Sequence, residues 1–151
     1  MIVHILWRTI MENENNVTVQ KNGAPAIINI SAETWFNEYF RKEIWTGKHL
    51  QITVMNIPAG GEVGIELHDN LDQILAVEYG VASVYTGNSR QTINYLGRAS
   101  QNTLIVIPAG TWHNVINERN IPLKLYSVYA PPKHPIGTIH KTKFDSDLAD
   151  Y

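Results

Sequence analysis

Two stretches of this sequence decide its fold: GGEVGIELHDNLDQ at residues 60–73 and PAGTWHNVIN at residues 108–117. Each stretch places a turn rich in glycine or proline before a short strand-like run. The first run carries carboxylate, histidine and amide side chains, and the second carries a histidine close to its turn. Together they predict the two halves of a metal site on paired β-strands.

The composition is that of one globular domain. The 151 residues are 44% apolar and 17% charged, which argues against disorder and allows a buried core. The net charge of −2 gives no indication of binding to nucleic acid or to an anionic membrane. Because the chain has no cysteine, any metal must be held by nitrogen and oxygen ligands.

No apolar run is long enough to span a bilayer. Residues 1–10 contain His4 and Arg8, have no basic start and no small-residue cleavage site, and so do not resemble a signal peptide. Met11 is a second candidate start. We expect a cytoplasmic protein with a loose N-terminal arm (1–24), one folded domain (25–140) and a C-terminal tail (141–151).

One helix is predicted over residues 29–45. Ser31 suits its N-cap, and Glu33 suits its first turn. An apolar face would form from aromatic pairs four residues apart, Trp35 with Tyr39 and Phe36 with Phe40. We therefore expect this helix to pack on the outside of a sheet.

Short alternating runs replace the helical pattern from Lys48 onward. Turns containing glycine, proline or asparagine separate them. The expected strands cover residues 50–55, 62–68, 73–79, 81–85, 91–96, 103–107, 113–117 and 123–130. Many short strands at this spacing predict an all-β sandwich or barrel, followed by an extended tail after the proline-rich residues 131–135.

Four polar residues in the two opening stretches are candidates for chemistry. Glu66 and His68 would point to the same face of a strand, because strand side chains alternate. Gln73 lies beyond a predicted turn, and its face depends on that turn. His113 begins a strand after the turn at 108–110, so its ring could project from a barrel mouth. Such convergence from several strands is what a rigid metal site needs.

The spacing of these residues resembles the two motifs of the cupin superfamily. The first motif is matched by Gly60, five residues, Glu66-x-His68, four residues, Gln73, six residues and Gly80. The second is matched by Pro108-x-Gly110, two residues, His113, three residues and Asn117. Asn102 stands where the second motif opens with glycine. The resemblance implies a single-domain, jelly-roll-like cupin β-sandwich barrel over residues 25–140, with one N-terminal helix.

A narrower resemblance is to a branch of small bacterial cupins that are often labelled mannose-6-phosphate isomerase. Such labels are borrowed from fold similarity, because a fold hosts many activities. The residues that carry this resemblance are 45–51, 108–114, 122–126, 129–132 and 140–143.

The resemblance implies four metal ligands, usually three histidines and one glutamate. Here the four positions hold Glu66, His68, Gln73 and His113. Two imidazoles and one carboxylate suit non-haem Fe(II) or catalytic zinc, so we expect one divalent ion (Zn, Fe, Mn or Ni). Gln73 could be a weak oxygen ligand, or it could hold a water or a substrate by hydrogen bonds.

The sequence leaves the reaction open. The family label favours a sugar or sugar-phosphate isomerase, although no phosphate-binding motif is visible. The ligand set favours an Fe(II)-dependent dioxygenase, and the amide at position 73 also suits a ligand-binding cupin without catalysis. The small-molecule substrate is unknown, and four further aromatic side chains could reach the barrel mouth: Tyr126, Tyr129, His134 and His140. A homodimer is expected through the arm and the aromatic face between Trp35 and Phe40.

Overall fold

The computed structural model describes residues 22–149. The predicted N-terminal arm therefore lies mostly outside the described residues, and the predicted domain boundaries stay a prediction. The described elements are β1 (Arg41–Thr46), β2 (Gln51–Ile57), β3 (Asp72–Tyr79), β4 (Ala82–Gly87), β5 (Asn94–Ala99), β6 (Leu104–Ile107), β7 (Trp112–Ile116), β8 (Leu123–Ala130), β9 (Ile139–His140), α2 (Ile30–Phe36) and α3 (Lys143–Leu148).

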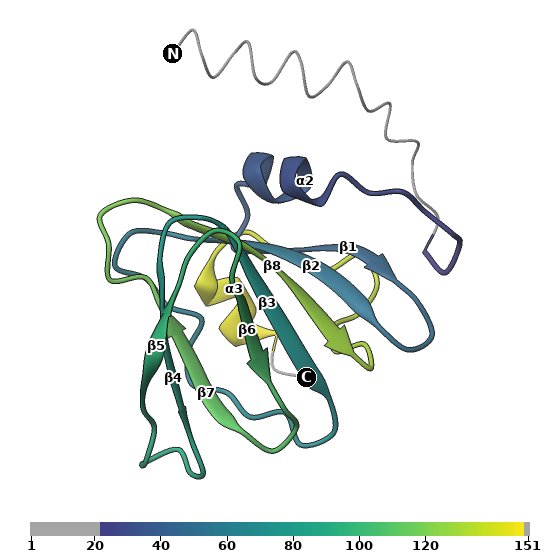
Figure 1. Ribbon diagram of the computed structural model, residues 1–151. Helices are drawn as coiled ribbons and strands as arrows, with labels where there is room; N and C mark the ends of the chain where they lie inside the picture. Colours follow the sequence, from purple (N-terminus) through teal and green to yellow (C-terminus); the bar gives the residue numbers. More distant parts are fainter. Residues whose placement is uncertain (1–21, 150–151) are drawn as a thin grey trace, which may run out of the picture.

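The strands form two antiparallel sheets that face each other (Figure 1). The larger sheet has the order β6-β3-β8-β2-β1-β9, and the smaller one has the order β5-β4-β7. Apolar side chains from both sheets fill the space between them, including Leu75 and Leu125 from the larger sheet and Val84 and Val115 from the smaller one. The predicted all-β sandwich is confirmed.

The inner face of the larger sheet changes from polar to apolar along its strands. One row of paired residues crosses β2, β8, β3 and β6 through Gln51, Tyr129, Gln73 and Ile107. Four residues further along β2, a second row consists of Met55, Leu125 and Val77. The polar row is buried as deeply as the apolar one, so its hydrogen-bonding groups must find partners inside the protein.

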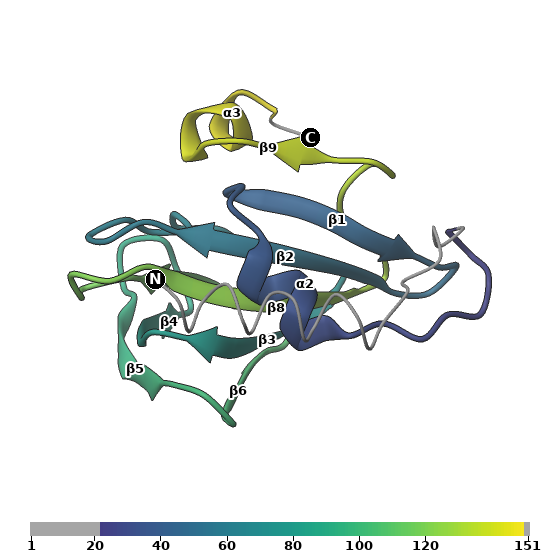
Figure 2. The ribbon, with the colours of Figure 1, turned by 90° about the horizontal axis from the view of Figure 1, so that it is seen from above.

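The helix predicted over residues 29–45 is wrong in its length. α2 ends at Phe36, and its N-cap is Asn29, whose side chain accepts a hydrogen bond from the Ala32 amide. Asn37 leaves the helix in an extended conformation and exchanges hydrogen bonds with the Tyr39 backbone, a local alternative to helix that asparagine favours. The expected packing is confirmed, because α2 contacts the outer face of β2, β3 and β8 (Figure 2).

Residues 41–46 form β1 instead of the end of the predicted helix. Arg41 and Glu43 point into the protein and are only 4% and 8% exposed. The predicted aromatic face does not form either, since Phe40 is buried in the core and Trp35 packs edge-on against Tyr79, with the ring centroids 4.9 Å apart. This strand therefore has charged residues on its inner face, the reverse of the usual pattern.

The 62–68 segment, predicted as a strand, is extended but irregular. It pairs with β7 only through isolated bridges, between Glu62 and Ile116 and between Glu66 and His113. Gly64 interrupts it with a φ of 104°, a value that residues with a side chain rarely adopt. Asn102, where the resemblance places a glycine, has a φ of 68°, which asparagine tolerates better than most residues.

The C-terminal tail holds structure that the sequence did not predict. β9 pairs with β1, and α3 follows it. The side chain of Thr142 caps α3, and Asp145 completes the capping box by accepting a hydrogen bond from the Thr142 amide. Neither α2 nor α3 is long and apolar enough to cross a membrane.

Candidate metal centre

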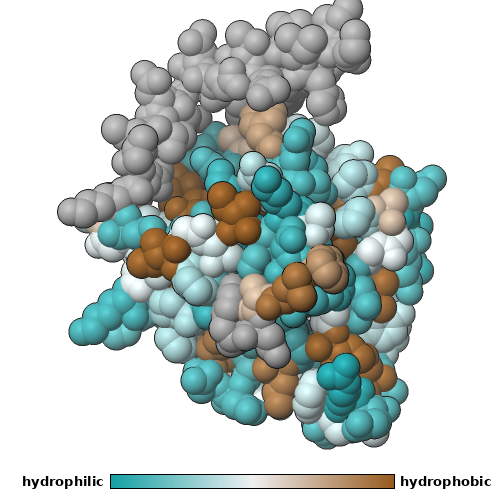
Figure 3. All heavy atoms as spheres, turned by 180° about the vertical axis from the view of Figure 1, so that it is seen from behind, coloured by the Kyte–Doolittle hydropathy of each residue, from teal (hydrophilic) through white to brown (hydrophobic). Residues whose placement is uncertain are grey.

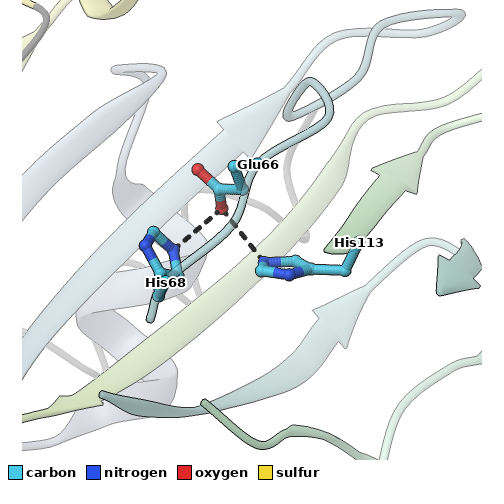
Figure 4. A group of neighbouring side chains, drawn as sticks. All are labelled: Glu66, His68 and His113. Atoms are coloured by element: carbon cyan, nitrogen blue, oxygen red, sulfur yellow. Dashed lines mark ion pairs between the residues drawn. The ribbon is translucent and has the colours of Figure 1, made fainter. Parts of the chain in front are cut away.

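Three of the four predicted ligands lie together between the sheets (Figure 4). Oε1 of Glu66 is 3.4 Å from Nε2 of His68 and 3.3 Å from Nε2 of His113. One ligand atom from each residue lies within 4.8 Å of the other two. These three residues could hold a metal ion. Their role as metal ligands stays a prediction, which a measurement of metal binding would test.

The backbone brings these side chains together from two directions. The Glu66 amide donates to the carbonyl oxygen of His113 at 2.9 Å, and the His113 amide donates to the carbonyl oxygen of Glu66 at 3.0 Å. This pair of hydrogen bonds fixes the two residues opposite each other. His68 follows two residues later in the same extended segment, so its ring reaches the same side as Glu66, as the alternation predicted.

Asn114 fixes the start of the 62–68 segment. Its Nδ2 donates to the Glu62 carboxylate at 2.7 Å, and its Oδ1 accepts from the Gly64 amide at 2.9 Å. Because Asn114 follows His113 directly, one strand both carries a candidate ligand and positions the segment that carries two others. Sequence reasoning missed this role, although the adjacent polar pair at 113–114 was a usable signal.

The two imidazoles offer their Nε2 atoms to the centre. Nδ1 of His113 lies 2.8 Å from the carbonyl oxygen of Thr111, which can only accept a hydrogen bond. The proton is therefore on Nδ1, which leaves the Nε2 lone pair free, the arrangement found in metal-binding histidines. Nε2 of His68 and Nε2 of His113 are both buried without a hydrogen-bond partner.

The carboxylate of Glu66 carries negative charge at the centre. Burial raises the pKa of Glu66, but the imidazoles of His113 and His68 beside it lower the pKa by more, so its net value is far below the usual range. An ionised oxygen and two nitrogen lone pairs thus converge on one point. A cation at that point would satisfy all three groups.

Gln73 faces the same interior from β3. It is 2% exposed and lies opposite Tyr129 in the polar row. Its Nε2 donates to Oγ of Ser127 at 2.8 Å, whereas its Oε1 is buried without a hydrogen-bond partner. A buried oxygen without a partner is costly, and it fits either a metal ligand or a group that holds a bound water. Both alternatives stay open.

A cavity of about 570 Å³ adjoins the centre. One wall is the 62–68 segment, which includes Glu66 and His68. The facing wall comes from β1, the loop before β9, β9 itself and α3. Its polar residues are Arg41, Lys133, His134, His140, Lys143, Ser146 and Asp147. The arrangement joins a candidate metal site to a space large enough for a small molecule.

Three of the four aromatic residues left unplaced by the sequence form a row beside this cavity. The ring of Tyr129 lies edge-on to those of His68 and His134, with centroids 6.0 Å and 5.1 Å away. The ring of His134 lies edge-on to that of His140 at 6.2 Å. Tyr126 instead lies on the outer face of β8, since it alternates with Ser127 and Leu125. Only the first three are therefore placed to influence a bound molecule.

Arg41 is a cavity residue that sequence reasoning missed, since it fell inside the predicted helix. No periodicity signal could have found it, because a charged residue on an alternating strand is read as solvent-facing. Arg41 also affects its surroundings: burial, followed by the Arg41 charge, lowers the pKa of His134 to about 3. His134 is therefore neutral at pH 7.

Two known proteins are similar to this chain over most of its length. No family model matches it. The protein YrkC of Bacillus subtilis is 45% identical over 143 residues, which cover 95% of this chain and 77% of YrkC. The crystal structure of BH2720 from Bacillus halodurans is 45% identical, with a TM-score of 0.84, and the match covers 87% of this chain and all of that one.

More distant solved structures share the fold alone. The cupin domain of Cnp3 from Schizosaccharomyces pombe is 16% identical with a TM-score of 0.52, and the match covers 60% of this chain and 59% of the chain in that structure. The narrower resemblance to the branch labelled mannose-6-phosphate isomerase stays a prediction. From the 45% identity with YrkC over nearly the whole chain, we conclude that this chain belongs to the same family as YrkC, and it shares the fold of the cupin domain of Cnp3.

Proposed function

We propose that this protein is a metal-dependent enzyme that acts on a small molecule in the cavity beside Glu66, His68 and His113. One observation carries the proposal: two buried imidazole nitrogens without hydrogen-bond partners face a single ionised carboxylate oxygen. Such a set is costly when empty and favourable around a divalent cation. The adjoining cavity leaves room for a substrate next to that cation.

The donor set restricts the metal. Two nitrogens and one oxygen suit Fe(II) or zinc, both of which leave positions open for water or substrate. A bound ion would polarise a substrate oxygen or lower the pKa of a bound water. The chain itself would orient the ligands through Asn114 and Thr111, and Gln73 would supply a neutral oxygen to the ion or to its water.

Isomerisation of a sugar or sugar phosphate is the first candidate reaction. It requires a group that moves a proton between neighbouring carbons of the substrate. His134 lines the cavity, and because its pKa is lowered to about 3, it would orient the substrate by hydrogen bonds and would not itself take up the proton at pH 7. Conversion of an aldose to a ketose by the metal-loaded protein, lost in His134→Ala with the metal retained, would support this reaction.

Fe(II)-dependent dioxygenation is the second candidate, and the ligand set itself favours it. Two histidines and one carboxylate with open positions are the typical site of non-haem Fe(II) oxygenases. Oxygen consumption in the presence of Fe(II) and a panel of small organic substrates would identify this reaction. A protein that binds ligands but neither isomerises nor oxidises them would instead be a non-catalytic ligand-binding cupin.

Metal content tests the proposal directly. The protein would be purified without a histidine tag and its metal measured by mass spectrometry, alongside Glu66→Ala and His113→Ala. We expect about one divalent ion per chain in the wild type and only traces in the two variants. His49→Ala removes an exposed histidine and is the matched control, which should keep the metal. Trace metal in the wild type, or equal metal in all four proteins, would contradict the proposal.

We also propose that the protein forms a homodimer. The aromatic face first expected to mediate it is used inside the chain, because Phe40 is in the core. On the face seen in Figure 3, hydrophobic residues lie in separate patches among hydrophilic ones. Phe144 and Leu148 of α3 are more than two-thirds exposed, and a second copy of the chain would cover such apolar side chains. Light scattering that gives the mass of a single chain would reject the dimer.

A further inference from the structure

Arg41 is a buried cation in the wall of the cavity. It is 4% exposed, and it extends from β1 toward β9 and α3. Its Nη1 donates to Oγ of Ser146 and lies 3.3 Å from Nδ1 of His140, while its Nη2 lies 3.9 Å from the sulfur of Met55. Its Nε has no hydrogen-bond partner. All of these partners are neutral groups or weak acceptors.

No carboxylate forms an ion pair with Arg41 within residues 22–149. A guanidinium keeps its charge at every physiological pH, so burial cannot be relieved by loss of a proton. A buried charge is normally offset by an opposite charge, and a hydroxyl and a thioether do not supply one. Within residues 22–149 the structure therefore holds a buried positive charge that no carboxylate offsets by direct contact.

The other charged groups of the cavity are already engaged or exposed. Nζ of Lys143 forms an ion pair with Asp147 at 2.8 Å. Glu62 accepts a hydrogen bond from Asn114, and Glu66 faces the two histidines. None of the three carboxylates that line the cavity, Glu62, Glu66 and Asp147, forms an ion pair with Arg41. A divalent ion beside Glu66 would make the cavity still more positive.

We propose that the cavity binds its small molecule through an oxyanion group, a carboxylate or a phosphate, that pairs with Arg41. This inference rests on the proposed function and adds a substrate class to it. A guanidinium presents N–H donors in a planar fork that matches both groups. Arg41 and the ligand His68 line the same cavity, so one molecule is able to contact the arginine and the metal site.

Anion-dependent thermal unfolding tests this inference. The probes are acetate and inorganic phosphate, with acetamide as the neutral counterpart of acetate and sodium chloride to match ionic strength. We expect acetate or phosphate to raise the unfolding midpoint of the wild type by about 2–4 °C, and acetamide to leave it unchanged. The probe that gives the larger rise identifies the carboxylate or the phosphate as the preferred group.

Two variants locate the effect. Arg41→Gln should abolish the rise, whereas Arg90→Gln, which removes an exposed arginine of the same cavity, should retain it. If Arg41→Gln does not fold, Arg41→Lys is used, and it should reduce the rise because it loses the planar fork. An equal rise in wild type and either Arg41 variant, or no difference between the anions and acetamide in the wild type, would overturn the inference.

The measurement is made on both metal-free and metal-loaded protein. A rise that depends on Arg41 in the metal-free protein cannot come from an anion bound to the metal. Metal content is measured separately for Arg41→Gln and should equal that of the wild type. A wild-type protein that binds no metal would thus count against the proposed function. A wild-type protein that binds metal but shows no anion-dependent rise in its unfolding midpoint would count against the role of Arg41.

Discussion

The two segments that supply the candidate ligands differ in regularity. His113 lies on β7, whose five residues pair continuously with β4. Glu66 and His68 lie on the 62–68 segment, which contacts β7 through isolated bridges and bends at Gly64. A regular strand carries one candidate ligand, and an irregular segment brings two other candidates to the same point. The comparison indicates that the second segment depends on specific tethers, while the first depends only on its sheet.

The strongest test of this difference is to cut the main tether. Asn114→Ala removes two hydrogen bonds to the 62–68 segment and leaves the amide of Gly64 without its acceptor. We expect a loss of about 1–3 kcal/mol in the free energy of unfolding. We also expect metal affinity to fall about 10- to 100-fold, as for other groups that orient ligands. Denaturant unfolding and metal titration measure the two effects.

Asn94→Ala is the control for that variant. Asn94 is exposed on β5 and donates one hydrogen bond to the carbonyl oxygen of Thr92. Its removal should change stability by less than about 0.5 kcal/mol and leave metal affinity unchanged. If Asn114→Ala behaved like Asn94→Ala, the segment would not need its tether.

A smaller effect on stability and metal affinity is expected from a substitution at Gly64, where the 62–68 segment bends. In Gly64→Ala the new side chain would occupy a φ of 104°, at a cost of about 1–2 kcal/mol. The Cβ would also contact Lys143 of α3 at 3.5 Å. Metal affinity should fall about tenfold because Glu66 shifts. Gly97→Ala, with open space around its Cβ and no positive φ, should leave both quantities unchanged, and equal behaviour of the two variants would refute the bend's importance.

Loss of the α3 cap should spare the metal centre. Thr142→Ala removes the capping box, so the helix should lose about 1 kcal/mol of local stability. Hydrogen exchange of the α3 amides should accelerate, while metal content remains that of the wild type. A drop in metal content would mean that the cavity wall, and not only β7, positions the 62–68 segment.

The smallest effect concerns the same cap at acidic pH. Hydrogen bonds from the backbone and side chain of Thr142 lower the pKa of Asp145 below its ordinary value of 3.8. The contribution of the cap is therefore fully present above that value and is lost as the pH falls through the lowered pKa. The amide resonance of Thr142 should move in this acidic range, and the remaining amides of α3 should follow. A wild-type α3 unchanged by acid would show that Asp145 does not hold the cap.

The regular parts of the fold were predictable because their sequence obeys simple periodicity. β2, β3, β6 and β8 lie within one or two residues of the predicted ranges. Motif spacing also placed Glu66, His68 and His113 together, because alternation on an extended segment survives the irregularity at Gly64. These strands were predictable because alternate apolar side chains along them face the core.

The errors arose where this pattern is reversed. Aromatic residues at Trp35, Phe36 and Phe40 mimic a helical stripe, although Phe40 belongs to the core and the helix ends at Phe36. Arg41 and Glu43 face inward, so β1 has no apolar alternation to recognise. α3 left a usable signal, since Thr142 and Asp145 have capping-box spacing. The distant pairing of Arg41 with His140 could not be read from local sequence.

The row of rings beside the cavity has a spectroscopic consequence. The rings of His68, Tyr129, His134 and His140 follow one another in this order. Each ring lies edge-on to the next, with ring centroids 6.0, 5.1 and 6.2 Å apart. Ring currents therefore act on the protons of the adjacent ring in each pair. Because the effect falls steeply with distance, resonances of Tyr129 should register a change in the orientation of His68, and resonances of His134 should register a change in that of His140, which lies beside Arg41. Occupancy of the metal centre and of the cavity beside Arg41 could thus be followed at two neighbouring residues in one experiment, without a label.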